Sequence, residues 1–79
     1  MTHALLRLGR SALLGLAEAL ASGRLGPPFT RSSVSHHIPD EHREVVLAAL
    51  AEMHADGMAP RHIARALGLL AEERAVEQR

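Results

Sequence analysis

The fold is decided by the stretch from Asp40 to Glu73, which reads DEHREVVLAALAEMHADGMAPRHIARALGLLAEE. Apolar residues recur in it every three or four positions on both sides of one corner, which is the pattern of two amphipathic helices. Gly57 predicts the end of the first helix, because glycine readily takes the left-handed conformation that closes a helix. Pro60 predicts the start of the second helix, where its missing N–H does no harm. We therefore expect a helical hairpin over 41–75.

The two helices of this hairpin are expected over 41–55 and 60–75. Asp40 precedes the first of them, and its carboxylate is suited to accept hydrogen bonds from the free N–H groups of the first turn. We therefore expect Asp40 to be the N-cap. The helical spacing of the apolar residues predicts the inner faces, with Val46, Leu50 and Met53 in the first helix and Ile63, Ala66, Leu67 and Leu70 in the second.

A third helix is predicted over 3–22, where leucine and alanine recur on one side. Gly9 and Gly15 lie within it, and each costs about 1 kcal/mol relative to alanine in a helix interior. We therefore expect these two glycines to mark places where another helix comes close.

Residues 23–39 are predicted to be a connector, because a glycine followed by two prolines cannot continue a helix. Within this connector, Thr30 is a suitable N-cap for a short extra helix near 31–36. Phe29 and Val34 are its apolar residues, and we expect both to anchor it against the bundle.

The composition agrees with an all-α fold. The chain has 79 residues, which suit a single domain over 1–79, and 47% of them are hydrophobic, almost all leucine, alanine, valine and isoleucine. Only 1% are aromatic, whereas a β domain normally uses more β-branched and aromatic residues. We expect a small three-helix bundle built from the helical hairpin and the N-terminal helix, followed by a polar tail over 76–79.

The composition also limits location and partners. There is no cysteine, which excludes disulfides and thiolate metal sites and fits the cytoplasmic location that we expect. The formal net charge of +0 gives no bulk attraction to nucleic acid. No apolar run reaches the roughly 18 residues that a transmembrane helix needs, so we expect no membrane partner.

The six histidines do not predict a metal site. A zinc site needs three or four converging ligands, and neither an HxxxH pair on one helix nor an HExxH motif occurs. We therefore expect no metal and no cofactor. Of the histidines, His54 is the one that we expect to be partly buried.

Three serines lie beside two histidines in the connector, at Ser32, Ser33, Ser35, His36 and His37. A nucleophile and its base are residues of these types, but catalysis also needs them held in a pocket. All five share one short segment, in which serine commonly hydrogen-bonds to nearby backbone. We therefore interpret them as structural and expect no catalytic residue.

DNA binding through the helix from Pro60 is the alternative interpretation. Ile63-Ala64 and Leu67-Gly68-Leu69 match the spacing of a helix-turn-helix, in which a short helix leads through a turn into a recognition helix. The residues that follow, 70–73, instead read as a continued helix, so we do not favour nucleic acid as a partner. In this alternative the DNA-contacting residues are Arg61, His62 and Arg65.

Taken in chain order, several short motifs resemble one known family. They are LAEALASGRL (Leu16–Leu25), PPF (Pro27–Phe29), IP (Ile38-Pro39), GMAP (Gly57–Pro60) and LLAEERA (Leu69–Ala75). Together they resemble the N-terminal helical region of DrmC, the phospholipase-D-like family of DISARM anti-phage systems. The phosphodiester chemistry of that family rests on HxKxxxxD motifs in a later domain. This chain contains no lysine, so none of those catalytic residues can be carried over.

The resemblance implies a non-catalytic helical module that docks to the rest of such an enzyme, to a defence-system partner or to itself. We accordingly predict that this chain is not an enzyme. We expect an accessory module that acts by protein–protein or self association, as an oligomer or with a protein partner. Its apolar residues exceed what a core of this size needs, and the excess is expected to form one exposed patch for the partner, made of Leu6, Leu14, Leu69 and Val76.

Overall fold

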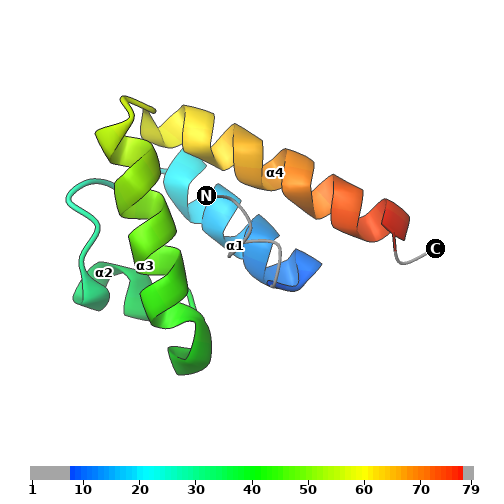
Figure 1. Cartoon of the computed structure of the whole chain (residues 1–79), viewed down its shortest axis with the longest axis horizontal. Helices are drawn as coiled ribbons and strands as arrows, with labels where there is room; N and C mark the ends of the chain where they lie inside the picture. Colours follow the sequence, from blue (N-terminus) through cyan, green and yellow to red (C-terminus); the bar gives the residue numbers. More distant parts are fainter. Residues whose placement is uncertain (1–7, 78–79) are drawn as a thin grey trace.

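The structure, a computed structural model, describes residues 8–77 and contains four helices in that range (Figure 1). No strand occurs in this part of the chain. The all-α class and the small bundle predicted from the sequence are confirmed. The helices are α1 (Arg10–Ala21), α2 (Arg31–Ser35), α3 (Asp40–Ala55) and α4 (Pro60–Glu77).

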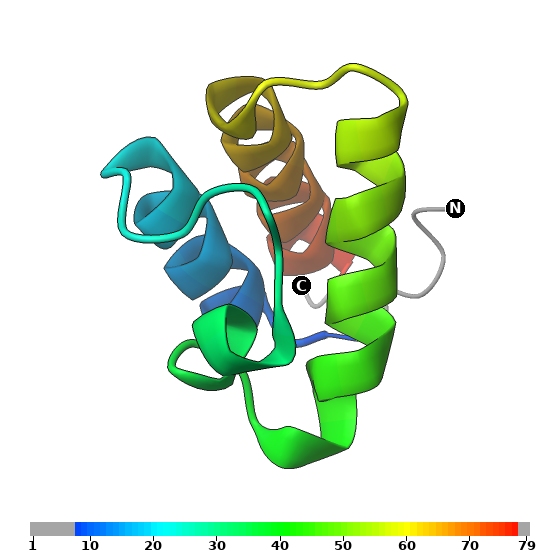
Figure 2. The same cartoon turned by 90° about the vertical axis from the view of Figure 1, so that its left-hand side faces the viewer.

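The longest interface of the bundle lies between α1 and α4, which run side by side in opposite directions (Figure 1). α2 packs on α3, and these two elements cover one end of the α1–α4 pair (Figure 2). α3 and α4 meet at the corner over 56–59 and diverge from it. The main partner of α4 is therefore not its neighbour in the chain but the first helix.

The core is entirely apolar among the described residues and draws on every helix. Fully burying one leucine or isoleucine side chain contributes about 1.5–3 kcal/mol. The predicted inner faces of the two longer helices are largely confirmed, although Ala66 and Leu70 are only half-buried. The buried residues are Leu8, Leu13, Leu16, Ala19, Leu20, Leu25, Val34, Ile38, Val46, Ala49, Leu50, Met53, Ile63, Ala64, Leu67 and Ala71.

The corner between α3 and α4 is closed by Gly57, as predicted. Its φ of 90° lies in the left-handed region, and its N–H donates to the carbonyl of His54 at 3.0 Å. The N–H of Met58 donates to the carbonyl of Met53 at 3.1 Å. These two bonds form a Schellman motif, which satisfies carbonyls that the helix end leaves free. Pro60 then begins α4, also as predicted.

The connector carries its short helix where the sequence predicts it. The hydroxyl of Thr30 accepts from the N–H of Ser33 at 3.1 Å, and the Ser33 hydroxyl accepts from the N–H of Thr30 at 2.9 Å. This reciprocal capping box satisfies donors at the start of α2. Val34 is fully buried, and Phe29 is half-buried against the core. Both residues thus anchor the connector.

Several predicted helix ends differ from those in the structure, and α1 and α2 each end one residue before the predicted position, at Ala21 and Ser35. α1 begins at Arg10, because Gly9 is extended (φ −68°, ψ 162°) and takes the N-cap position; residues 3–7 lie outside the described residues. α3 begins one residue early, with Pro39 at the N-cap position. α4 continues to Glu77, two residues beyond the predicted end, so the tail expected over 76–79 starts as helix; residues 78–79 lie outside the described part.

Two predicted roles of single residues are also wrong. Asp40 makes no capping bond, because it is the first helical residue and its carboxylate pairs with the guanidinium of Arg43 one turn further on. Gly15 is exposed, and a Cβ built on it or on Gly9 meets nothing within 4 Å. Neither glycine therefore permits a close approach of another helix.

Candidate interaction surface

Two large apolar side chains stand exposed on the same face of α4. The exposed fraction is 54% for Leu69 and 66% for Val76. They are seven residues apart, which places them two turns apart on one side of a helix. Both line one open groove together with Glu72 and Glu73. The core side of α4, which carries Ile63 and Leu67, is turned the other way.

Leu14, another residue of the predicted patch, lies in a second groove that α1 and α4 form together. The exposed fraction of its side chain is 38%. The groove is lined by Leu14, Ala17, Glu18 and Ala21 from α1 and by Arg61, Ala64 and Arg65 from α4.

The two grooves follow one another along α4. Arg61, Arg65, Leu69, Glu72 and Val76 succeed each other at spacings of three or four residues, which lines them up on one side of the helix. All five are exposed, and so is Glu73 beside them. We call these six residues the outer stripe of α4. The structure thus brings Leu14, Leu69 and Val76 onto neighbouring surfaces, whereas Leu6 lies outside the described residues.

The charges of the outer stripe are divided by sign along the helix. Arg61 and Arg65 make its first half positive, and Glu72 and Glu73 make the part after Leu69 negative. Among the described residues, none of these four side chains takes part in an ion pair. Within the described part of the chain, the stripe therefore presents two arginines and two glutamates without ion pairs, on either side of an exposed leucine.

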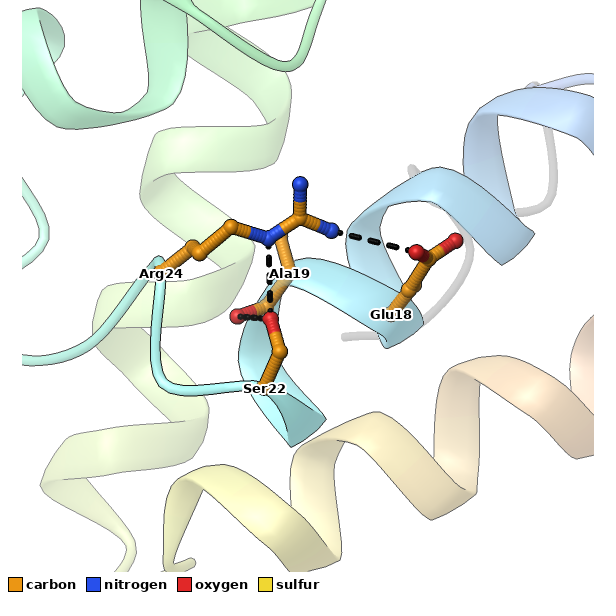
Figure 3. A network of polar contacts seen from close by, with 4 residues as sticks. All are labelled: Glu18, Ala19, Ser22 and Arg24. Carbon is orange, nitrogen blue, oxygen red and sulfur yellow. Dashed lines mark hydrogen bonds and ion pairs between the residues drawn. The ribbon is translucent and has the colours of Figure 1, made fainter.

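The acidic residue in the lining of the second groove is already engaged. Glu18 accepts from Nη2 of Arg24 at 3.2 Å, and Nε of Arg24 donates to the hydroxyl of Ser22 at 2.9 Å (Figure 3). This network ties the connector to the last turn of α1. Because the Glu18 carboxylate is paired there, Arg61 and Arg65 have no acidic partner in their own groove.

One exposed apolar residue, Val45, lies outside the predicted patch. Val45 on α3 has an exposed fraction of 37%, but it does not line either groove. The helical spacing had placed Val46, not Val45, on the inner face of α3, but Val45 was not included in the predicted patch. Val45 is an isolated exposed residue, which is common on protein surfaces.

The histidines are distributed differently from the prediction. His54 is exposed, not partly buried, and it contacts the edge of the Phe29 ring. His37 and His42 are the half-buried ones. In residues 8–77, no three His, Cys, Asp or Glu side chains are grouped so that they could hold a metal ion.

The serines of the connector serve its local structure. The hydroxyl of Ser33 donates to the carbonyl of Thr30 at 2.9 Å, and the hydroxyl of Ser35 donates to the carbonyl of Ser32 at 2.8 Å. These hydroxyls thus find their hydrogen-bond acceptors on nearby backbone, as serine commonly does. These contacts agree with the structural interpretation of the Ser and His cluster.

The helix-turn-helix pattern is not formed within α4. That pattern requires a turn after Leu69, but α4 is one uninterrupted helix from Pro60 to Glu77. Arg61, His62 and Arg65, the candidate DNA-contacting residues, are all exposed in the first two turns. If α4 bound DNA, it would do so as one continuous helix from Pro60 to Glu77 and not as two helices joined by a turn.

Comparison of the chain with protein-family models, with curated proteins and with solved structures found no match. Within the described residues, none of the helices combines the length and the apolar character needed to cross a membrane.

Proposed function

We propose that this chain is a non-catalytic helical interaction module that acts by protein–protein or self association. The observation that supports this proposal is the outer stripe of α4. Leu69 and Val76 are exposed on a helix whose opposite face already fills the core, so they contribute nothing to folding there. Exposed apolar side chains rimmed by charged ones are the usual composition of a binding surface.

The resemblance to DrmC supplies the context of this proposal. In that context the module belongs to a phospholipase-D-like, DISARM-type anti-phage defence system and acts in the cytoplasm. It docks there to the catalytic phospholipase-D-like domain, to another protein of the defence system or to a second copy of itself. The chain itself carries no lysine and hence no HxKxxxxD motif, so the proposal assigns it binding and no hydrolysis.

The alternative is a DNA-binding protein that uses the helix from Pro60. Exposure of Arg61, His62 and Arg65 at the start of α4 supports it. The same side of the helix also presents Glu72 and Glu73, which would meet the phosphates of a duplex with the wrong sign. We therefore rank DNA binding second.

The test uses size-exclusion chromatography with light scattering on the whole chain. The chain is run alone, with a random DNA duplex at low salt, and with a purified phospholipase-D-like domain of a DISARM system. The variants are Leu69→Glu/Val76→Glu and, as a control for an exposed valine outside the stripe, Val45→Glu.

We expect the chain to elute at the same volume with and without the duplex. We also expect self-association or binding of the phospholipase-D-like domain, lost in the double variant and kept in Val45→Glu. Co-elution with the duplex that disappears at higher salt would overturn the proposal, because such salt dependence is typical of phosphate contacts. Association that is unchanged in the double variant would exclude the outer stripe as the binding surface.

A further inference from the structure

We propose that the partner of the outer stripe is a second copy of this chain, paired so that the two α4 helices run antiparallel about a two-fold axis at Leu69. This inference rests on the proposed function and names the partner class. In a two-fold interface the same surface of both copies is used, so every contact occurs twice.

The stripe is self-complementary in this arrangement. Arg65 lies four residues before Leu69, and Glu73 lies four residues after it. An antiparallel helix therefore sets each Arg65 opposite Glu73 of the second copy, with the two Leu69 side chains in contact between these pairs. Arg65 and Glu73 have no ion pair among the described residues of their own chain, and the other copy supplies one to each.

The remaining exposed apolar residues fall into the same register. Val76 lies seven residues after Leu69, so it faces the level seven residues before Leu69, which is the turn that holds Arg61 and Arg65. That turn forms one wall of the groove in which Leu14 lies. Val76 of each copy thus covers the groove of the other, and the exposed Leu14, Leu69 and Val76 of both copies lose water together.

The order of the charges is unfavourable within one isolated helix. Arg61 lies in the first turn of α4, which contains no acidic residue and where the helix dipole favours negative side chains. Arg61 and Arg65 are one turn apart and repel each other, since like charges at this spacing are destabilising. An antiparallel second α4 places Glu73 beside Arg65, which offsets the repulsion between the two arginines.

Other occupants fit the divided charge less well. A DNA duplex or a uniformly acidic protein would meet Glu72 and Glu73 with like charge, and a uniformly basic one would meet Arg61 and Arg65. An antiparallel second copy presents its charges in the opposite order along the helix, so that its negative half faces the positive half of the first copy. The formal net charge of +0 means that two copies do not repel each other overall. The stripe from Arg61 to Val76 spans about 22 Å. Because this interface is short, we expect a dissociation constant on the order of micromolar.

The test is sedimentation equilibrium of the whole chain between about 1 and 500 µM, a range that brackets such an affinity. The wild type is expected to approach twice its mass of 8.5 kDa. Arg65→Glu and Glu73→Arg should each raise the dissociation constant of the dimer at least tenfold, because each substitution brings like charges together at both contacts. A one-to-one mixture of these two variants should regain association, because a mixed pair has opposite charges at both contacts.

The double variant Arg65→Glu/Glu73→Arg should also associate by itself, because it exchanges the signs at both antiparallel contacts. Glu52→Arg, an exposed charge reversal on α3, is the control and should associate like the wild type. Circular dichroism checks that every variant is folded. A wild type that stays monomeric at the highest concentration, or single variants that associate like it, would overturn the dimer.

Failure of the dimer and failure of the proposed function give different results. A monomer that ignores DNA and binds the phospholipase-D-like domain overturns the dimer alone. Salt-sensitive binding to the duplex by a monomer overturns both proposals.

Discussion

The ring of Phe29 meets the ring of His54 edge-on, with centroids 6.0 Å apart and planes at 87°. Phe29 belongs to the connector before α2, and His54 lies in the last turn of α3. Edge-to-face rings of this kind attract each other, and Phe29 also packs against the core. The contact therefore holds the connector against the end of the helix that leads into the corner.

Phe29→Ala should lower the free energy of unfolding by about 2 kcal/mol, less than the loss for a fully buried phenylalanine because Phe29 is half-buried. Urea unfolding followed by circular dichroism measures this change. His54→Ala is the control and should cost less than about 1 kcal/mol, since His54 is exposed and loses only the ring contact. Equal losses in both variants would show that Phe29 does not anchor the connector.

Leu67 and Leu69 form a matched pair for testing the orientation of α4. Leu67 is fully buried and Leu69 is 54% exposed, although they are two residues apart in one helix. Leu67→Ala should destabilise the chain by about 2–5 kcal/mol, because it leaves a cavity in the core. Leu69→Ala should change stability by less than about 1 kcal/mol when the chain is dilute, as is usual for surface positions. Chemical denaturation of both variants would contradict the orientation of α4 if the order of the two effects were reversed.

Gly15→Ala should stabilise the chain by up to about 1 kcal/mol, because alanine favours a helix interior more than glycine does. Gly15 is exposed and an added Cβ meets nothing within 4 Å. In a chain of this size we expect the thermal midpoint to rise by about 4–8 °C per kcal/mol. Gly57→Ala should instead lower the thermal midpoint, because the φ of 90° at Gly57 strains any residue with a Cβ. A thermal melt in which Gly15→Ala lowers the midpoint would indicate that a partner approaches α1 there.

The thermal midpoint of the wild type should rise with protein concentration, because a dimer stabilises the folded state by mass action. Leu69→Glu/Val76→Glu should remove this dependence and leave the midpoint of the dilute chain nearly unchanged, since both side chains are exposed. Differential scanning calorimetry over a hundredfold range of concentration measures the effect. A double variant that is unfolded even when dilute would show that these residues support the fold and not an interface.

Local signals in the sequence correctly predicted the corner between α3 and α4 and the start of α2. Gly57 and Pro60 mark the corner, and Thr30 caps α2, because each of these residues acts on the backbone within one turn of itself. The same kind of reasoning failed at Asp40. Its carboxylate had two partners within reach, the free N–H groups and the guanidinium of Arg43, and it pairs with the second.

The site could be predicted only in part. The helical spacing of apolar residues indicated that Leu69 and Val76 lie away from the inner face of α4, and both are exposed. They were predicted to share one patch with Leu14, but Leu14 lies in a separate groove, because its position depends on the packing of α1 along α4, two helices far apart in the chain. The burial of His54 was predicted wrongly for a similar reason, since the position of Phe29 beside it is set by the path of the connector.

Local signals in the amino-acid sequence establish that this chain is all-α, where the corner between α3 and α4 and the start of α2 lie, and which face of each of the two longer helices is apolar. These properties follow from hydrogen bonds, glycine and proline conformations and a period of three to four residues, all of which act locally. Only the three-dimensional packing shows that α4 pairs with α1, that Arg24 engages Glu18, and that Arg61 and Arg65 lie next to Leu14 without an ion pair among the described residues. These relationships depend on which distant segments share the core, because burial favours any close-packed apolar contact and does not by itself select the partner.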